Sequence, residues 1–296
     1  MISRIKSKRV TWCLGRHLLV MLATVLLGAL LAATLVRVAP GFDVDEQQLD
    51  SRLSSESRDA LRSGRVRNGN IVVFYVDYLR RAISGDLGRS QILNRPVREL
   101  IAERLPVTTH LVALGLLWGW LIATALGAIA ALARVNSVRM FIGGAAGALL
   151  CFPSAVLAMA FVVARAPAYL ALALVVLPKV FAFTRNLVIS SYAMPHVITA
   201  RAKGIRETRV LLWHVLPVTG GQVIAVFGVS VSMALGAAIP VEALCGLPGI
   251  GQLAWQAALG RDLPLLVTLT MIVACVTMTA NSISDAMNQI LGPATR

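Results

Sequence analysis

The chain has 296 residues, of which 57% are apolar and only 14% are charged, and its mean hydropathy is +0.75. A water-soluble domain of this length needs far more charge on its surface, so the composition excludes an ordinary soluble enzyme or binding domain. The apolar runs are continuous rather than alternating, which excludes a transmembrane β-barrel and predicts an all-α, polytopic membrane protein.

Six segments are predicted to be transmembrane helices, each of which needs roughly 20 apolar residues. They lie at about 17–37, 107–133, 140–164, 167–187, 215–240 and 263–284. The first follows a basic N-terminus and imitates a secretory signal peptide, but its apolar run is longer than the usual h-region of about 7–15 residues. We therefore interpret residues 1–38 as a cytoplasmic N-terminus with an uncleaved first transmembrane helix.

Basic residues gather at three places along the chain. The groups are Arg4, Lys6, Lys8, Arg9 and Arg16 before the first span, Arg134 and Arg139 after the second, and Arg185, Arg201, Lys203, Arg206 and Arg209 after the fourth. By the positive-inside rule these places are cytoplasmic, which puts both termini inside. The net charge of +14 could indicate a nucleic-acid partner. Because the excess forms no basic soluble domain, we exclude nucleic acid and expect membrane lipid around the chain.

Residues 39–106 form the only long polar stretch and are predicted to be a large external loop, followed by a five-helix membrane core at 107–296. Apolar residues at helical spacing predict an amphipathic helix at 71–83, on the outer membrane surface or against the spans. A turn at 85–90 and a second helix from Pro96 to Arg104 are expected to follow.

A basic, helix-forming loop at about 190–217 separates the fourth and fifth spans. Pro195 is well placed at a helix start and Gly204 at a helix stop, and Arg201 and Lys203 suit the helix C-terminus. A second helix at about 207–215 is expected to join this element to the fifth span. A short, rigid element of this kind is a natural surface for a cytoplasmic partner. The alternative is an ordinary loop that is basic because of topology alone.

This loop resembles the coupling loop of the membrane subunits of ATP-binding-cassette (ABC) importers, in which a Gly is followed at a fixed distance by Leu-Pro, here Gly204 and Leu216-Pro217. The variant Thr199-Ala-Arg-Ala-Lys-Gly204 is similar to the dipeptide/oligopeptide/nickel permease family in particular. Further matches to this family, in order, are Arg37-Val-Ala-Pro-Gly41, Gly85-Asp-Leu-Gly-Arg-Ser90, Arg95-Pro-Val97 and Glu103-Arg-Leu-Pro106.

The resemblance implies a type I permease-like fold in the bacterial inner membrane and alternating-access transport, with peptides as the solute class. It implies three kinds of protein partner: a second related permease subunit, two ABC ATPase subunits and an external solute-binding protein. ATP hydrolysis belongs to the ATPases, so the chain is expected to be no enzyme and to hold no catalytic residue, cofactor or metal. The residues implied to couple to the ATPases are Thr199, Ala200, Arg201, Ala202, Lys203, Gly204, Arg206, Glu207, Leu216 and Pro217.

Beyond the fifth span, Pro240-Val-Glu-Ala-Leu-Cys-Gly-Leu-Pro-Gly-Ile-Gly251 resembles another motif of the same family. We expect a tight external turn there, with a role in closing the outer end of the pathway. Its candidate residues are Glu242, Pro248, Gly249 and Gly251. Further matches are Arg261-Asp262, Pro264, Asn281 and Asp285. The short link Arg165-Ala-Pro167 departs from the family, whose outer loop at this place is usually substantial. The solute and the need for a binding protein therefore stay open.

Polar and soft side chains within the spans are candidates for the solute pathway. They are Lys179, Gln222, Ser230, Ser232 and Met233. An ionisable residue inside a span is costly and often functional. Three interpretations of Lys179 stay open: it lines the pathway, it pairs with Glu242 or Asp285, or it snorkels from a tilted helix.

Two function classes compete with an importer subunit. A membrane-embedded enzyme needs paired polar residues at matching depth in different spans, and the sequence shows no clear pair. An ion-coupled secondary transporter needs inverted repeats and more charge inside the membrane. Neighbouring genes for an ATPase and a binding protein would separate these alternatives from the importer.

Overall fold

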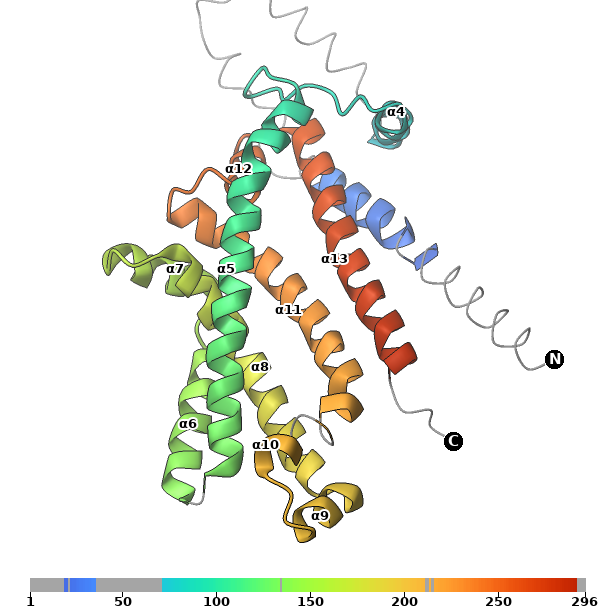
Figure 1. Cartoon of the computed structure of the whole chain (residues 1–296). Coiled ribbons are helices and arrows are strands. Elements are labelled where there is room, and N and C mark those ends of the chain that lie inside the picture. Colours follow the sequence, from blue (N-terminus) through green and yellow to red (C-terminus); the bar gives the residue numbers. More distant parts are fainter. Residues whose placement is uncertain are drawn as a thin grey trace, which may run out of the picture. The chain divides into compact units, whose positions relative to one another are not determined.

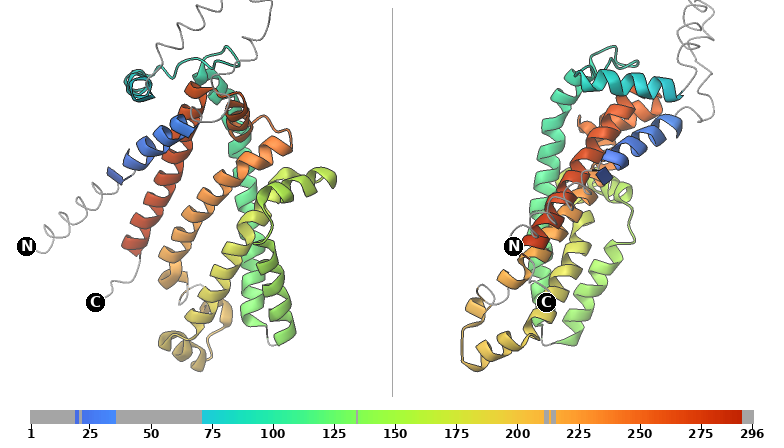
Figure 2. Two further views of the ribbon diagram at one scale, coloured as in Figure 1. Left: turned by 180° about the vertical axis from the view of Figure 1, so that it is seen from behind. Right: turned by 90° about the vertical axis from the view of Figure 1, so that its right-hand side faces the viewer.

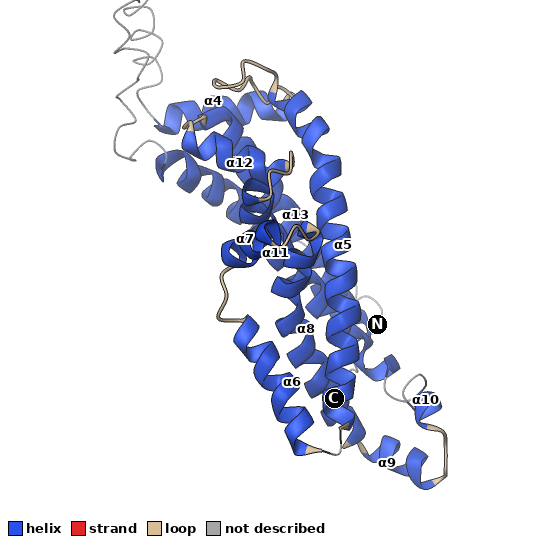
Figure 3. Cartoon of the chain, turned by 90° about the vertical axis from the view of Figure 1, so that its left-hand side faces the viewer, coloured by secondary structure: helices blue, strands red, loops and turns tan. Residues whose placement is uncertain are grey.

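The structure, a computed structural model, describes residues 19–20, 22–35, 71–133, 135–210, 213 and 216–291, and the regular elements within these ranges are all helices (Figure 3). The helices, shown in Figure 1, are the N-terminal helix Leu22–Leu35, α4 (Ile71–Ile83), α5 (Val97–Leu132), α6 (Asn136–Leu149), α7 (Ser154–Val163), α8 (Ala168–Tyr192), α9 (Pro195–Ala202), α10 (Glu207–Val210), α11 (Leu216–Leu244), α12 (Ile250–Leu259) and α13 (Leu263–Leu291). The motif at 37–41 and the part of the predicted external loop up to residue 70 lie outside the described residues.

Four helices, α5, α8, α11 and α13, are long and apolar enough to cross a membrane. They correspond to the second, fourth, fifth and sixth predicted spans. The N-terminal helix is apolar but shorter in its described part, so the count of six spans stays a prediction. The all-helical, membrane-spanning class is confirmed for the part of the chain that the structure describes.

The third predicted span, at 140–164, is two helices rather than one. The helices α6 and α7 are long and apolar enough to cross a membrane only when they are taken together, and they are bent by 99° at the break between them. Pro153 lies at this break and precedes the first residue of α7. Proline has no N–H to continue the ladder of α6, and it disfavours helical dihedral angles at the residue before it. The pair is therefore either one broken span or a re-entrant loop.

Pro106 does not interrupt α5, so the predicted helix at 96–104 and the second span are one continuous helix. Proline within a helix removes one backbone hydrogen bond, which transmembrane helices tolerate where neighbouring groups satisfy the freed carbonyl. The described residues fall into two compact units, one within 1–105 and 253–275 and one within 106–252 and 276–296. Residues of α5, α12 and α13 contribute to both units.

In the first unit, the predicted amphipathic helix is present as α4 and packs against the N-terminal helix and the start of α13. The Tyr75 hydroxyl donates a hydrogen bond to the Leu26 carbonyl oxygen at 2.6 Å, and the Tyr78 hydroxyl lies 2.5 Å from the Thr268 hydroxyl. Burial raises the pKa of the Tyr78 hydroxyl above its ordinary value. The polar tips of two buried tyrosines thus fix α4 against helices of its own unit.

In the second unit, α8 is the central helix and packs against α6, α7 and α11. Glycines of α5 allow that helix to approach α8 closely. A Cβ atom at Gly115 would lie 2.6 Å from the Cδ2 atom of Leu172, and one at Gly127 would lie 2.9 Å from the Cβ atom of Thr184. Small residues of this kind let membrane helices approach within van der Waals contact of each other's backbone.

Candidate functional site

The loop between α8 and α11 holds the first candidate site, and it is built around the short helix α9 (Figures 1 and 2). Pro195 occupies the first helical position, where its missing N–H costs nothing. Gly204 follows the helix with φ of +74°, which is the left-handed region that only glycine enters easily. The sequence predictions of a helix start at Pro195 and a helix stop at Gly204 are confirmed.

Two backbone hydrogen bonds close the C-terminus of α9. The Gly204 N–H donates to the Arg201 carbonyl oxygen at 2.9 Å, and the Ile205 N–H donates to the Ala200 carbonyl oxygen at 3.3 Å. This pair of bonds is the Schellman motif, which requires the left-handed residue between them. No other atom lies within 4 Å of the position of a Cβ at Gly204, so the backbone conformation, and not lack of space, calls for glycine.

A small apolar core fixes α9 and α10 to each other. Val197, Ala200 and Val210 are buried, and Ile205 packs against them together with residues from the end of α8. The Arg201 guanidinium carbon lies 5.3 Å from the centre of the Tyr192 ring, at the last residue of α8. The loop is therefore a folded element attached to α8 rather than a flexible connection.

The outward face of this loop is basic and partly apolar. Its exposed residues are His196, Ile198, Thr199, Arg201, Ala202, Lys203, Gly204 and Arg206. Most of the predicted coupling residues that the structure describes lie on this face, whereas Ala200 is buried beneath it. The structure does not describe the side chains of Glu207, Leu216 and Pro217. The backbone places Leu216 at the start of α11.

Sequence reasoning missed two apolar members of this surface. Ile198 is 56% exposed and Trp213 is 74% exposed. Large apolar side chains at protein interfaces supply most of the binding free energy, and basic neighbours add charge complementarity. The signal that could have identified them was a large apolar residue among the basic residues of a loop expected to face the cytoplasm.

The external turn after α11 is the second candidate site. Glu242 is completely buried, and its Oε2 atom accepts hydrogen bonds from the N–H groups of Gly251, at 2.6 Å, and Gln252, at 3.3 Å. The Thr108 hydroxyl accepts a hydrogen bond from the Ile250 N–H at 2.7 Å. Both side chains thus satisfy the free N–H groups at the start of α12.

Close packing explains the glycines of this turn. A Cβ at Gly249 would overlap the Glu242 carboxylate, and one at Gly251 would lie 2.7 Å from the Ile239 Cα atom. Pro248, directly before Gly249, is exposed. The predicted tight turn is present, and it brings the chain back against the end of α11. The interpretation in which Glu242 pairs with Lys179 is wrong, because the carboxylate caps α12 and makes no ion pair with that lysine.

The five pathway candidates do not share one surface. Ser230 is buried and its hydroxyl donates to the Val226 carbonyl oxygen within α11. Ser232 donates to the Asn281 side-chain oxygen of α13 at 3.2 Å, and Met233 is half-buried. Lys179 and Gln222 are exposed.

A third polar site lies in the first unit, where Asp262 joins two of the motifs noted in the sequence. Its buried carboxylate accepts hydrogen bonds from the Ser90 hydroxyl at 2.5 Å and from the N–H groups of Gln91 and Ile92. The second carboxylate oxygen accepts from the Leu265 N–H and so caps α13. Sequence reasoning noted Arg261-Asp262 as a match but assigned this carboxylate no contact.

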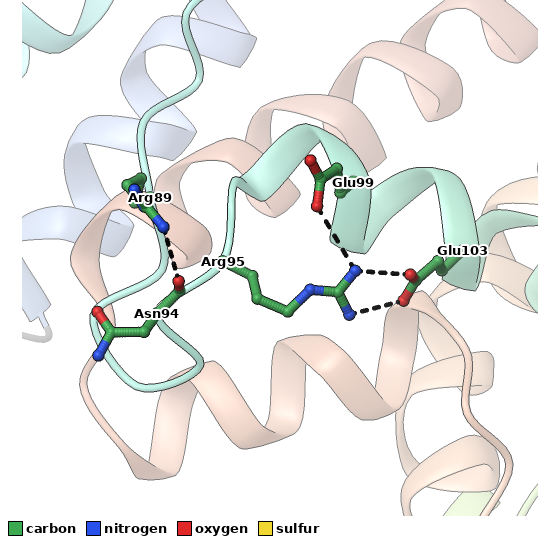
Figure 4. Close-up of polar contacts among 5 residues, drawn as sticks. All are labelled: Arg89, Asn94, Arg95, Glu99 and Glu103. Atoms are coloured by element: carbon green, nitrogen blue, oxygen red, sulfur yellow. Dashed lines mark hydrogen bonds and ion pairs between the residues drawn. The ribbon is translucent and has the colours of Figure 1, made fainter.

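The same loop is held on its other side by an exposed ion-pair cluster. The Arg95 guanidinium donates to both carboxylate oxygens of Glu103, at 2.6 and 3.0 Å, and lies 3.6 Å from Glu99 (Figure 4). The hydrogen bond with Glu103 raises the pKa of the Arg95 guanidinium. Arg89 donates to the Asn94 carbonyl oxygen in the same turn. This bidentate geometry fixes the turn to the first part of α5.

Comparison with a family model identifies most of the membrane core. Residues 123–296 match the model described as "Binding-protein-dependent transport system inner membrane component". This stretch includes α9, Gly204 and the external turn. The match confirms the family resemblance that the motifs predicted.

Individual permease proteins align with between three quarters and nearly all of the chain. A protein named putative peptide permease protein BOV_A0351, from Brucella ovis, is 27% identical over 95% of this chain and 98% of its own length. The oligopeptide transport system permease protein AppB of Bacillus subtilis is 27% identical over 91% of this chain and 94% of its own. The oligopeptide permease protein OppB of Salmonella typhimurium is 27% identical over 77% of this chain and 82% of its own.

A solved structure shares the fold. A chain from the inward-facing MetNI methionine ABC transporter superposes with a TM-score of 0.59 and covers 66% of this chain and 98% of that chain. Its sequence identity is 12%, so this likeness concerns the fold alone.

Proposed function

Because the chain belongs to the family of binding-protein-dependent transport system inner membrane components, and so is a permease subunit of an ABC importer, we propose that it carries peptides across the inner membrane. The names of the peptide and oligopeptide permeases that align with nearly the whole chain support this solute class. The partners in this proposal are a second related permease subunit, two ABC ATPase subunits and an external solute-binding protein.

The observation that carries the proposed mechanism is the folded loop between α8 and α11. We place the ATPase contact on its outward face, with Ile198 and Trp213 as apolar anchors and Arg201, Lys203 and Arg206 as the charged surround. ATP hydrolysis takes place on the partner subunits. The movement of an ATPase reaches this chain as a displacement of α9.

The connection of α9 to its neighbours suits a mechanical coupling. The helix follows the end of α8 directly, and the loop leads into α11, whose backbone begins at Leu216. Helices α8 and α11 pack against each other along the core of the second unit. A displacement of α9 therefore acts on two packed membrane helices together, which shifts the population between inward-facing and outward-facing states.

In this proposal α9 faces the cytoplasm, both termini lie inside, and the turn at Glu242 lies outside. The positive-inside rule carries the orientation. Labelling of intact cells with a membrane-impermeant thiol reagent tests it. A cysteine placed at Ser57 should react and a cysteine placed at Arg206 should not. Reaction at Arg206 would reverse the orientation and remove the proposed ATPase site from the cytoplasm.

The function is tested by reconstitution of the chain with its ATPase, permease and binding-protein partners into proteoliposomes. Addition of ATP on the ATPase side should drive uptake of radiolabelled tri-alanine, and non-hydrolysable ATP should not. Nickel ion serves as the control solute, since the family includes nickel permeases. Uptake of nickel in place of peptide, or uptake without ATP, would contradict the proposal.

A further inference from the structure

The exposed stripe of α8 differs chemically from the exposed stripe of a lipid-facing helix. Helix α8 is packed against α6, α7 and α11 over most of its circumference. Along this helix Lys179, Ala182, Asn186 and Ser190 stay exposed at intervals of three and four residues, and Ile189 is exposed beside Ser190. Residues at this spacing lie on one helix face. The free face of α8 therefore combines a cation, an amide and a hydroxyl with one small side chain.

Helix α5 of the same unit provides an internal comparison. Between 117 and 129 its exposed residues are Leu117, Trp118, Leu121, Ile122, Ala125 and Ile129, of which only Trp118 carries a polar atom and none carries a charge. Such a stripe suits contact with lipid, whereas the stripe on α8 would leave a charge and an amide in hydrocarbon. The two helices are both long enough to span the membrane, so the difference concerns the medium that each face contacts.

Lys179 lies in the interior of α8, away from both ends of the helix. It lies 11 residues from the start of α8 and 13 from its end, which places it about 16 Å and about 20 Å from the two ends of the helix. A lysine side chain spans only about 6 Å at ordinary bond lengths. Arg185, the first of the basic residues expected at the cytoplasmic end of this span, is six residues or about 9 Å further along the helix, so an extended Lys179 side chain still falls short of its level.

No carboxylate of the described residues forms an ion pair with Lys179. The buried carboxylate of the same unit, Glu242, is used to cap α12. A cation at the middle of a span is stable only opposite a negative group or water. The partner of Lys179 is therefore not one of the carboxylates of the described residues.

We propose that Lys179 binds a carboxylate of the transported solute and that the exposed stripe of α8 lines the solute pathway. This inference rests on the proposed function and names the chemistry of its solute: a compound with a free carboxylate, such as the C-terminus of a peptide. A lysine ammonium offers three donors to such a group, and the Asn186 amide offers both a donor and an acceptor to a peptide bond.

The spacing of the two polar side chains fits an extended peptide. Lys179 and Asn186 are two helical turns apart, which is about 10 Å along the axis. An extended chain covers about 3.3–3.6 Å per residue, so this distance corresponds to about three residues. A tripeptide with its carboxylate on Lys179 therefore places its amino end near Asn186, whose side-chain oxygen can accept a hydrogen bond from it.

The test uses the reconstituted complex with tri-alanine as the probe, and the variants Lys179→Gln, Lys179→Arg and Lys179→Cys. Lys179→Gln should lower the rate of ATP-driven uptake at least tenfold while the ATPase and second permease subunits stay bound. Lys179→Arg, which keeps the positive charge, should retain most of the uptake. The Lys179→Cys variant is made in a chain whose four native cysteines are replaced by serine. A thiol reagent that adds an ethylammonium group should restore uptake, and one that adds an ethylsulfonate should not.

A cysteine at Leu121, on the exposed stripe of α5, is the matched control for access. The water-soluble reagents should modify the Lys179→Cys variant and not the Leu121→Cys variant. Uptake by Lys179→Gln at the wild-type rate would overturn the carboxylate site while leaving the importer proposal intact. Loss of the second permease subunit from Lys179→Gln would also overturn it, by assigning the lysine to a subunit contact. If the wild-type complex takes up no peptide, the proposed function fails first, and this inference fails with it.

Discussion

Replacement of Gly204 tests whether the conformation of one residue controls coupling. A Cβ at this position meets no atom within 4 Å, so substitution produces no clash. Its effect comes from φ of +74°, which costs an L-residue about 1–2 kcal/mol. A β-branched residue is disfavoured most strongly there, whereas asparagine enters this region with the least penalty after glycine.

The size of the effect differs between folding and docking. The strain is small against the stability of about 5–15 kcal/mol of a typical domain, so Gly204→Val should insert and fold. If α9 relaxes instead, the bonds that close it at Arg201 and Ala200 break and the helix end moves. If the ATPase binds only the native C-terminus of α9, part of the binding free energy is used to restore that conformation. A cost of about 1–2 kcal/mol then lowers the affinity for the ATPase about 5–30-fold.

The assay is co-purification of the ATPase subunits, together with peptide-stimulated ATP turnover, at equal membrane levels of each variant. We expect Gly204→Asn to resemble the wild type, Gly204→Ala to be intermediate, and Gly204→Val to lose transport. Full turnover in Gly204→Val would refute the role of this loop in coupling. Equal damage by asparagine and valine would refute the conformational argument, since it would show that any side chain at this place interferes.

Three further predictions follow from single contacts. Asp262→Ala removes a buried acceptor and the cap of α13, so it should destabilise the first unit by about 2–4 kcal/mol and expose the turn at Ser90 to trypsin; an unchanged cleavage rate would show that this carboxylate does not hold the turn. Glu242→Ala should remove the acceptor of the buried Gly251 N–H and lower the thermal stability of the purified complex, while Glu242→Gln, which keeps an acceptor oxygen, should retain most of it; equal stability of both variants would contradict this. Gly127→Ala should force α5 away from α8 at a cost of about 1–3 kcal/mol, measured as a lower melting temperature, whereas Gly143→Ala, where no atom lies within 4 Å, should not lower it.

The sequence predicted those parts of the fold that depend on local composition. Continuous apolar runs identified α5, α8, α11 and α13, because an apolar span of this length has one stable form in lipid. Helical spacing identified α4, and the pair Pro195 and Gly204 identified the ends of α9. Each of these features is determined by residues close together in the chain.

The features that the sequence did not predict are of two kinds. Some depend on contacts between residues far apart in the chain, and others depend on whether a proline ends a helix or is accommodated within it. The hydrogen bonds from Ser90 to Asp262 join positions 172 residues apart, and periodicity carries no information about such a pair. The break at Pro153 and the continuity of α5 through Pro106 show the same residue type ending one helix and not another. Neighbouring packing decides between these outcomes, and a single sequence does not specify it.

The central claim is that the outward face of α9 docks on an ATPase subunit, and disulfide cross-linking between the two proteins tests it most directly. Cysteines at Ile198 and Lys203, which are exposed, should cross-link to the ATPase in membranes, and the yield should change between the ATP-bound and nucleotide-free states. A cysteine at Val197, which is buried in the core beneath α9, is the control and should give none. An ATPase that co-purifies and hydrolyses ATP, yet cross-links to neither exposed position in any nucleotide state, would contradict the account.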